Sequence, residues 1–258
     1  AFEALDISVG EDGIATIRLS NAPVNAINEQ MRHELGDALD VVREDRVRVG
    51  VFTGTEKVFS VGADIELFEE ARDWTTAEFR SNSRILGRVF EDIETIEKPM
   101  IAAIEGTCVG GGLELALACD VRIVSPDATL GFPEHNIGLI PGLGGCSRFV
   151  HLVGPGRAKD MIFTGELVDG ERAGEIGLTE RVEDDPEASA QAYAESLLSQ
   201  PPQALGLAKR AVNTARDTDL QTAGLVESLA QSTLIKTQDH DEGVEAFREK
   251  RDAEFTGN

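Results

Sequence analysis

Apolar residues along the first hundred positions alternate between short strand-like runs and longer helical spacings. Alternating or continuous apolar runs bounded by glycine and polar turns predict strands, and apolar residues three and four positions apart predict amphipathic helices. The predicted strands cover residues 5–9, 14–19, 47–53 and 100–104, and the predicted helices cover residues 28–44 and 75–96. Asn28 is the expected cap of the first helix, because its side chain can accept a hydrogen bond from the first helical turn.

A glycine loop between a strand and a helix recurs in the middle of the chain. From residue 105 the order is strand, glycine loop, short helix and strand, and residues 130–145 repeat the loop and the short helix. Short β-β-α units that repeat in this way favour an α/β spiral over a doubly wound sheet.

The pattern changes near residue 186, where strand-like stretches stop. Helices are predicted at residues 188–198, 203–216, 220–235 and 241–255. Val244, Phe247 and Phe255 give the last of them an apolar stripe, and the segment is too short for a large core of its own. We therefore divide the chain into an α/β core, residues 1–195, and a helical oligomerisation segment, residues 196–258, which folds back on the core or onto a neighbouring subunit.

The charge of the chain excludes some classes of partner. With 24 basic and 47 acidic residues among 258, the net charge is −23. Such a surface disfavours nucleic acid, which needs basic residues to neutralise its phosphates, and it disfavours anionic membranes. The acids are spread along the chain, and arginine greatly outnumbers lysine. This composition favours a cytoplasm of very high salt, where the repulsion is screened; the alternative is an ordinary acidic protein.

The termini, cysteines and histidines add a few further expectations. The first residues lack a basic, apolar leader, and charges interrupt the apolar runs, so we expect a cytoplasmic protein with no membrane span. Cys108, Cys119 and Cys146 have no CxxC spacing and are predicted to be reduced core residues. The four histidines form no metal-spaced pair, which predicts no metal site.

The run Gly110-Gly111-Gly112 stands before a predicted helix that contains Glu114. Glycines let the backbone approach a ligand closely, and a helix start offers unpaired N–H groups toward negative charge. A phosphate loop is excluded, because no Lys-Ser/Thr follows, and the GxGxxG pattern of dinucleotide sites is absent. The helix is otherwise apolar, so Glu114 is either a functional buried carboxylate or a first-turn residue satisfied by the helix dipole.

Two further segments carry candidate chemistry. Pro133 suits the first position of a helix and would place Glu134 in its first turn, as a functional acid or as a surface residue that complements the dipole. The loop Phe59-Ser-Val-Gly-Ala-Asp-Ile65 can supply another backbone N–H, and Asp64 can cap the helix that follows. A simple capped loop is the alternative for these seven residues.

Taken together, these segments resemble the crotonase family and, within it, the enoyl-CoA hydratases. The resemblance rests on FSVGADI, GTCVGGGLELALACD, LGFPEHNIGLIPGLGG and the C-terminal EGVEAFREKRDAEF, in that order, and it runs from end to end. It implies a crotonase-like spiral of β-β-α turns with a C-terminal helical appendage. It also implies a homo-oligomer, either a trimer or a pair of trimers.

The resemblance assigns roles to particular positions. Ala63 and Gly111 match the two backbone N–H donors of an oxyanion hole, Glu114 the general base, Glu134 the general acid, and Gly142 an N–H that orients water. The implied reaction is syn addition of water to a trans-2-enoyl-CoA, with acyl-CoA as substrate and no cofactor. The alternatives are a Δ3-Δ2 enoyl-CoA isomerase, a hydratase of a branched or dicarboxylic acyl-CoA, and a non-catalytic CoA- or RNA-binding relative.

The implied contacts with coenzyme A form a second set. They are Ala22, Val24, Val61, Ala63, Asp64, Ile65, Phe247 and Lys250. The last two lie on the final helix, which in this family often contributes across a subunit boundary. Ala22 stands where many relatives carry a basic residue, so this part of the resemblance departs from the family pattern.

Overall fold

Most consecutive strands of the chain go to different sheets in the computed structural model, which describes residues 2–258; the exceptions are the two antiparallel pairs, β1–β2 and β10–β11. The strands are β1 Leu5–Val9, β2 Ile14–Leu19, β3 Ala26–Ile27, β4 Val49–Thr53, β5 Val58–Ser60, β6 Gly62–Ala63, β7 Met100–Ile104, β8 Thr107–Val109, β9 Val121–Val124, β10 Thr129–Gly131, β11 Leu167–Val168 and β12 Arg181–Val182. The α-helices are α1 Glu29–Arg43, α2 Ile65–Glu70, α3 Thr76–Thr95, α4 Gly111–Ala118, α5 Gly145–Val153, α6 Pro155–Thr164, α7 Gly170–Ile176, α8 Pro186–Leu198, α9 Pro202–Asp217, α10 Leu220–Leu234 and α11 Gln238–Glu249. Two short 3-10 helices, η1 Ala71–Asp73 and η2 Glu134–Ile137, complete the set.

The strands build a spiral of β-β-α turns. A six-stranded sheet has the order β1-β2-β4-β7-β9-β12, and a four-stranded sheet has the order β11-β10-β8-β5. The pairs β4/β5, β7/β8 and β9/β10 therefore each give one strand to either sheet before the chain turns into a helix. Strand pairing is parallel within each sheet except at β1–β2 and β10–β11. The predicted α/β spiral is confirmed.

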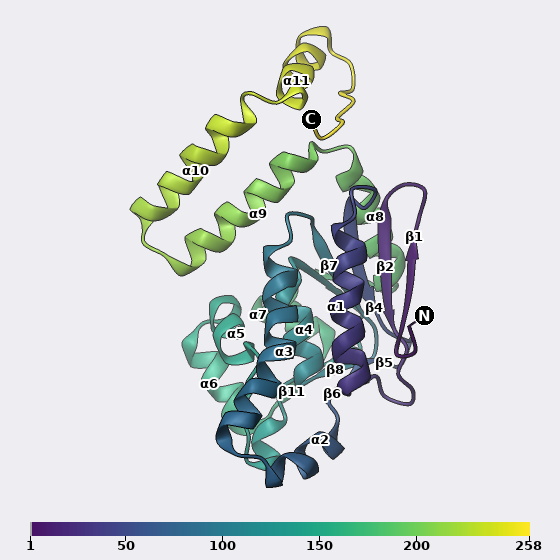
Figure 1. Cartoon of the computed structure of the whole chain (residues 1–258), viewed down its shortest axis with the longest axis vertical. Helices are drawn as coiled ribbons and strands as arrows, with labels where there is room; N and C mark the ends of the chain where they lie inside the picture. Colours follow the sequence, from purple (N-terminus) through teal and green to yellow (C-terminus); the bar gives the residue numbers. More distant parts are fainter. Residues whose placement is uncertain (1) are drawn as a thin grey trace.

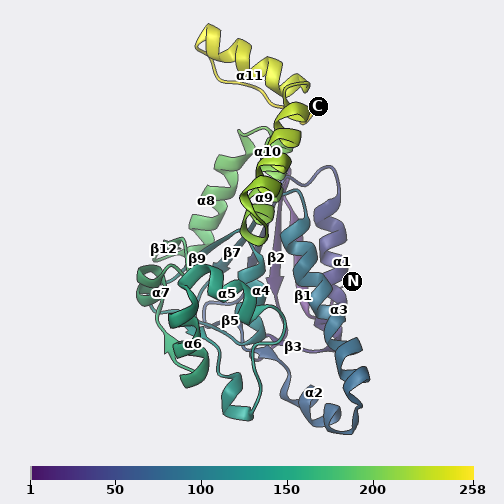
Figure 2. The same ribbon diagram turned by 90° about the vertical axis from the view of Figure 1, so that its left-hand side faces the viewer.

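Helices cover both faces of the six-stranded sheet (Figures 1 and 2). Every residue of β4 and β7 is buried, as expected for parallel strands covered on two sides. Because side chains alternate along a strand, Phe52 and Ala102 pack with α1 and α3, whereas Val51, Ile101 and Ala103 pack with α8.

The main helices begin where the sequence predicts. The side chain of Asn28 accepts a hydrogen bond from the N–H of Met31 at the start of α1. At the start of α3, Thr75 and Glu78 cap each other reciprocally, which satisfies two N–H groups left free by the first turn. The predicted segments at residues 28–44 and 75–96 are thus confirmed to within a residue at each end.

The C-terminal helices divide between the core and a projecting arm. Ala190 and Ala194 of α8 are buried against the sheet, so the proposed boundary at residue 195 falls inside a helix that belongs to the core. Beyond it, α9, α10 and α11 extend away from the sheets (Figure 1). Lys209 fastens α9 to the core, because its Nζ lies 2.9 Å from the carboxylate of Asp120 and also donates to the carbonyl of Ile93.

The prediction for the last helix was wrong at both ends. The helix runs from Gln238 to Glu249, and Lys250 ends it with a φ of 58°. The following tail folds back, because Asp239 accepts hydrogen bonds from the N–H groups of Thr256 and Gly257. Phe255 therefore lies on this tail rather than on the helical stripe.

Across residues 2–258, no helix is both long enough and apolar enough to cross a bilayer.

Substituting Gly112 by alanine tests the close contact between α4 and β5. A Cβ at this position of α4 would lie 2.4 Å from the carbonyl oxygen of Ser60 in β5. We expect Gly112→Ala to lower the free energy of unfolding in urea by about 1–3 kcal/mol through overpacking. Gly87→Ala in α3 is the control, since nothing lies within 4 Å of its added Cβ. That change should be neutral or stabilising by up to about 1 kcal/mol. Equal effects of the two changes would contradict the contact.

Candidate active site

A cavity of about 480 Å³ lies beside the N-terminus of α4. Its walls come from β3 and β6, from α2 and α3, and from η2 with the loop that follows it. Apolar side chains form most of the wall between α2 and α3, namely Ile65, Leu67, Phe68, Trp74, Phe79 and Leu86. At the opposite wall the cavity reaches Glu114 and Glu134. The space thus joins an apolar compartment to two carboxylates.

The carboxylate of Glu114 is buried and is held by backbone N–H groups of a neighbouring loop. Its side chain belongs to α4, is 2% exposed, and accepts hydrogen bonds at Oε1 from the N–H groups of Leu143 (2.7 Å) and Gly145 (2.8 Å). Burial raises the pKa of Glu114, and the two N–H groups and the charge of Arg148 oppose that rise. Gly145 permits the contact, because a Cβ there would lie 2.8 Å from Oε1.

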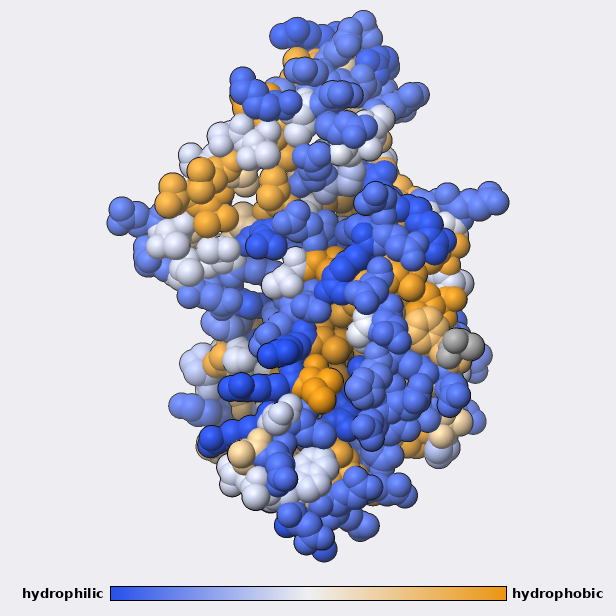
Figure 3. All heavy atoms as spheres, in the orientation of Figure 1, coloured by the Kyte–Doolittle hydropathy of each residue, from blue (hydrophilic) through white to orange (hydrophobic). Residues whose placement is uncertain are grey.

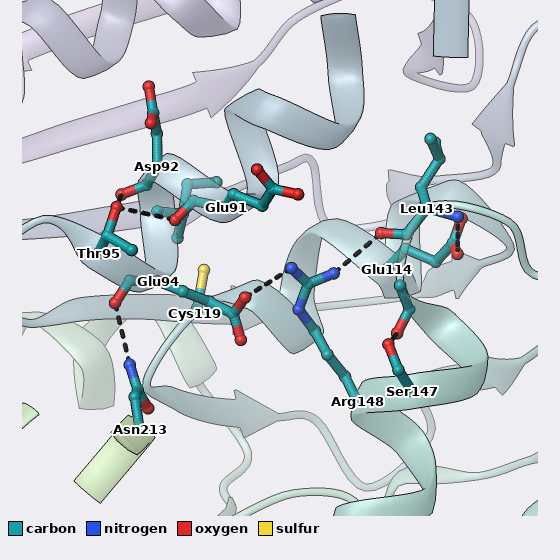
Figure 4. A network of polar contacts seen from close by, with 12 residues as sticks. Glu91, Asp92, Glu94, Thr95, Glu114, Cys119, Leu143, Ser147, Arg148 and Asn213 are labelled. Carbon is teal, nitrogen blue, oxygen red and sulfur yellow. Dashed lines mark hydrogen bonds and ion pairs between the residues drawn. The ribbon is translucent and has the colours of Figure 1, made fainter. Parts of the chain in front are cut away.

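A buried arginine fixes the loop that binds Glu114 (Figure 4). Arg148 of α5 donates to the carbonyl oxygen of Leu143 (2.9 Å) and to the carboxylate of Glu94 in α3 (2.6 Å). Gly144 makes room for the guanidinium, since a Cβ at that position would overlap it. Sequence reasoning missed Arg148, because nothing in its local pattern distinguishes it from a solvated residue of an amphipathic helix.

Glu134 occupies a different environment. It is the first residue of η2, and its Oε2 is buried without a hydrogen-bond partner among residues 2–258. Burial raises the pKa of Glu134 to about 7; its own N–H opposes this rise, and the charge of Glu114 adds a smaller contribution in the same direction as burial. Pro133 precedes the helix instead of opening it, and the helix is a single 3-10 turn; the predicted placement of Pro133 was therefore wrong by one position.

Two backbone nitrogens adjoin each other at the wall of the cavity. A Cβ on Gly62, whose φ is +88°, would lie 2.5 Å from the nitrogen of Gly111, and a Cβ on Gly111 would lie 3.3 Å from the nitrogen of Ala63. Gly111 is the first residue of α4, where N–H groups lack partners within the helix and the dipole is positive. Ser60 secures the segment, because its Oγ donates to the carbonyl of Asn25 and accepts from the N–H of Gly62.

The structure places most of the predicted site residues at this one cavity. The residues that line it are Val61, Ala63, Ile65, Gly111, Glu114, Glu134 and Gly142. Val24 lies beside it, since its carbonyl accepts the N–H of Val61 (3.2 Å), and Asp64 caps α2 through the N–H of Glu66. Ala22 is exposed and outside the lining.

Phe247 and Lys250 do not reach the cavity of their own chain. Both belong to α11 and its end, whereas the cavity lies near α2 at the opposite end of the molecule (Figure 1). Phe247 is 85% exposed. Any contact of these residues with a ligand in the cavity requires a second copy of the chain.

The cysteine prediction was wrong for one of the three residues. Cys108 and Cys119 are buried, but Cys146 is exposed on α5, because the helix turns that position away from the core. Within residues 2–258, no three or more His, Cys, Asp and Glu side chains are grouped so as to hold a metal ion.

The fold and the site define a protein of the crotonase class. A family description for enoyl-CoA hydratase/isomerase matches residues 10–258. A crotonyl-CoA hydratase of Syntrophomonas wolfei is 38% identical over 236 residues, which cover 90% of each chain. A short-chain-enoyl-CoA hydratase of Clostridium acetobutylicum is 36% identical over 95% of this chain and 94% of its own. The chain belongs to the enoyl-CoA hydratase/isomerase family.

A solved structure matches the whole fold as well. An enoyl-CoA hydratase from Bacillus anthracis superposes with a TM-score of 0.92 and is 34% identical, covering 99% of this chain and 100% of its own. The match therefore includes the projecting helices as well as the spiral.

Glu134 should link stability to pH. Its pKa of about 7 exceeds the ordinary value of 4.5, so the folded protein binds this proton more tightly than the unfolded chain does. The resulting stabilisation is complete below pH 4.5 and is lost as the pH rises to about 7. Urea unfolding of wild type and Glu134→Gln should show their difference in unfolding free energy falling across that interval.

Glu78→Gln is the control of opposite sign. The side chain and N–H of Thr75 lower the pKa of Glu78, so its contribution to stability is lost as the pH falls. A difference that stays flat or rises between pH 4.5 and 7 for Glu134→Gln would contradict the assigned environment of Glu134.

Proposed function

We propose that the protein is an enoyl-CoA hydratase that adds water syn across the double bond of a trans-2-enoyl-CoA to give the 3-hydroxyacyl-CoA. The observation that carries this proposal is that Glu114 and Glu134 face one cavity beside the nitrogens of Ala63 and Gly111. The printed names of similar proteins, crotonyl-CoA hydratase and short-chain-enoyl-CoA hydratase, support it.

The thioester oxygen would bind at the two backbone nitrogens. When water adds to Cβ of an α,β-unsaturated thioester, negative charge develops on the thioester oxygen. The N–H groups of Ala63 and Gly111 are fixed by the β3–β6 pair and by the start of α4, so they need not reorganise as that charge develops. Loss of one such donor typically costs about 3–4 kcal/mol of transition-state stabilisation.

The two glutamates would divide the proton transfers. Hydrogen bonds to Oε1 hold Glu114 in place, and its other oxygen would take a proton from the water that attacks Cβ. Glu134, with a pKa of about 7, would carry the proton that goes to Cα. The hydroxyl group added to Cβ and the proton added to Cα would both come from the same wall of the cavity, which gives syn addition. The N–H of Gly142 would orient the water, and transfer of one proton from Glu114 to Glu134 restores the starting state.

The presence of two carboxylates favours hydration over isomerisation. Moving a double bond needs one group that removes a proton and returns it, whereas hydration must activate water and protonate carbon. A second buried carboxylate is costly to retain without a role. Hydration is redox-neutral, so the proposed reaction needs acyl-CoA and water and no cofactor.

The coenzyme would follow the β6–α2 side of the cavity. Val61 and Ile65 line that side, and Val24 and Asp64 lie beside it, whereas Ala22 would contact the coenzyme from the exposed turn before β3. Phe247 and Lys250 would come from a neighbouring subunit, where the Lys250 ammonium could offset phosphate charge in this acidic protein.

The projecting helices would supply the contacts between subunits. Large apolar side chains are exposed on α9, α10 and α11, and Figure 3 shows apolar atoms gathered over the first two of them. They are Val212, Leu220, Leu225, Leu229, Ile235 and Phe247. We therefore propose a trimer or a pair of trimers built through this arm.

The proposal of a cytoplasm of high salt rests on the net charge of −23 and stays a prediction.

Replacing either glutamate should remove most of the activity. We expect Glu114→Gln and Glu134→Gln each to lower kcat about 10²–10⁴-fold, because each variant loses one proton-transfer group but keeps the cavity. The assay follows the ultraviolet absorbance of the enoyl thioester of crotonyl-CoA, at KCl concentrations up to molar. Glu166→Gln, an exposed carboxylate on the surface, is the control. Wild-type rates in either active-site variant would exclude that residue from the mechanism.

Charging the exposed face of α10 should separate the subunits. Leu225 and Leu229 are 60% and 59% exposed in the single chain. The double change Leu225→Glu, Leu229→Glu would place charges in the proposed interface, so sedimentation equilibrium should show a monomer in place of a trimer or hexamer. Glu227→Gln on the same helix is the control. A monomeric wild-type protein that is fully active would contradict the proposed assembly.

A further inference from the structure

An arginine of α1 lines the same cavity as the two glutamates. Arg32 is 5% exposed and forms part of the wall together with Asn82, Ser83 and Leu86 of α3. It lies near the start of α1, shortly after Ile27 of β3, and Ile27, which pairs with Ala63 across β3–β6, also lines the cavity. One wall therefore runs from the backbone nitrogens of the site to this guanidinium.

The hydrogen-bonding capacity of Arg32 is largely unused. Nη1 donates to the side-chain oxygen of Asn82, but Nε is buried without a partner. Within residues 2–258, no carboxylate lies within 4.0 Å of the guanidinium. Burial lowers the pKa of Arg32, and only the more distant charge of Glu29 opposes this.

The other buried arginines are arranged differently. Arg122 pairs with Glu180 and donates to the carbonyls of Leu178 and Cys119. Arg148 pairs with Glu94 and donates to the carbonyl of Leu143, as described above. Of these three arginines, only Arg32 has no carboxylate partner in the described chain, and it is also the one that lines the cavity beside the apolar wall.

A buried guanidinium without a counter-ion destabilises the protein unless a ligand supplies the opposite charge. Desolvating a cation without a counter-ion is unfavourable, and an apolar side chain would fill the position at lower cost. A guanidinium with free N–H groups matches the two oxygens of a carboxylate, with which it forms short, charge-assisted hydrogen bonds. Glu114 and Glu134 would repel a third carboxylate, brought into the cavity by a substrate, and a cation at this wall offsets that repulsion.

We propose that Arg32 is a specificity-determining residue that binds a carboxylate at the far end of the acyl chain, with Asn82 orienting the guanidinium. The preferred substrates are then 2-enedioyl-CoA thioesters, which carry a terminal carboxylate, over neutral enoyl-CoA thioesters. This inference rests on the proposed function, because it requires the enoyl thioester to lie in this cavity.

The test compares kcat/KM for crotonyl-CoA with kcat/KM for glutaconyl-CoA and its homologues one to three methylenes longer. The wild-type protein should prefer a member of the carboxylate series by about tenfold or more. Arg32→Met should lower that preference about 100-fold, because the carboxylate would be buried without a partner. Arg32→Lys should restore part of it, and Asn82→Leu should weaken it less than Arg32→Met does. Arg84→Met removes an exposed charge from α3 and should leave the preference unchanged.

The outcomes separate this inference from the proposed function. If the wild-type protein hydrates crotonyl-CoA, and its kcat/KM for every carboxylate-bearing thioester is no higher, Arg32 does not have this role. The hydratase proposal would still stand. If it hydrates no enoyl-CoA at all, the proposed function itself fails. If Arg32→Met lowers turnover of both CoA thioesters equally but spares pantetheine thioesters, the guanidinium binds a coenzyme phosphate and the inference is overturned.

Stability gives a readout that a merely structural arginine would not share. Removal of an unsatisfied buried charge should raise the midpoint of thermal unfolding of Arg32→Met above that of the wild-type protein. A clear fall in the midpoint, together with an unchanged substrate preference, would identify Arg32 as a structural residue and overturn the inference.

Discussion

Direct backbone contact between α4 and the β5–β6 segment is the constraint on which the site depends. Gly62, Gly111 and Gly112 lie where a Cβ would meet main-chain atoms of the facing segment. Side chains at these positions would push α4 away from β5 and β6. That displacement would part the nitrogens of Ala63 and Gly111 and would also shift Glu114, which α4 carries. One packing contact therefore sets both the amide pair and one carboxylate.

The two carboxylates differ because their surroundings differ. Glu114 has fixed N–H donors, supported through Leu143 by Arg148 and Glu94. Glu134 has one buried oxygen without a partner among residues 2–258, and burial, with a smaller contribution from the charge of Glu114, raises its pKa to about 7. Burial raises the pKa of both acids, but N–H groups of two other residues oppose the rise only at Glu114, so the two carboxylates are not equivalent.

Local sequence was informative wherever a local rule decides the structure. The cap at Asn28, the start of α3 beside Thr75, the apolar runs of β4 and β7, and the repeat of glycine loops all follow from spacing and residue type. The candidate glutamates came from their position at helix starts, but their meeting at one cavity depended on the family resemblance. Spacing alone left each of them with a surface alternative.

Long-range contacts explain what the sequence could not predict. The tail that carries Phe255 leaves the last helix because Asp239 binds N–H groups far along the chain. Arg148 and Arg32 both sit in amphipathic helices, and only the neighbouring elements decide that one braces a loop while the other borders the cavity. The exposure of Cys146 is a matter of helix rotation against the core.

A crystal structure with bound acetoacetyl-CoA, an unreactive analogue of the substrate, tests the central claim most directly. The account predicts that the thioester oxygen lies within hydrogen-bond distance of the nitrogens of Ala63 and Gly111. It also predicts that the carboxylates of Glu114 and Glu134 lie on the same side of the acyl chain. An analogue bound elsewhere, or with its thioester oxygen turned away from both nitrogens, would contradict it.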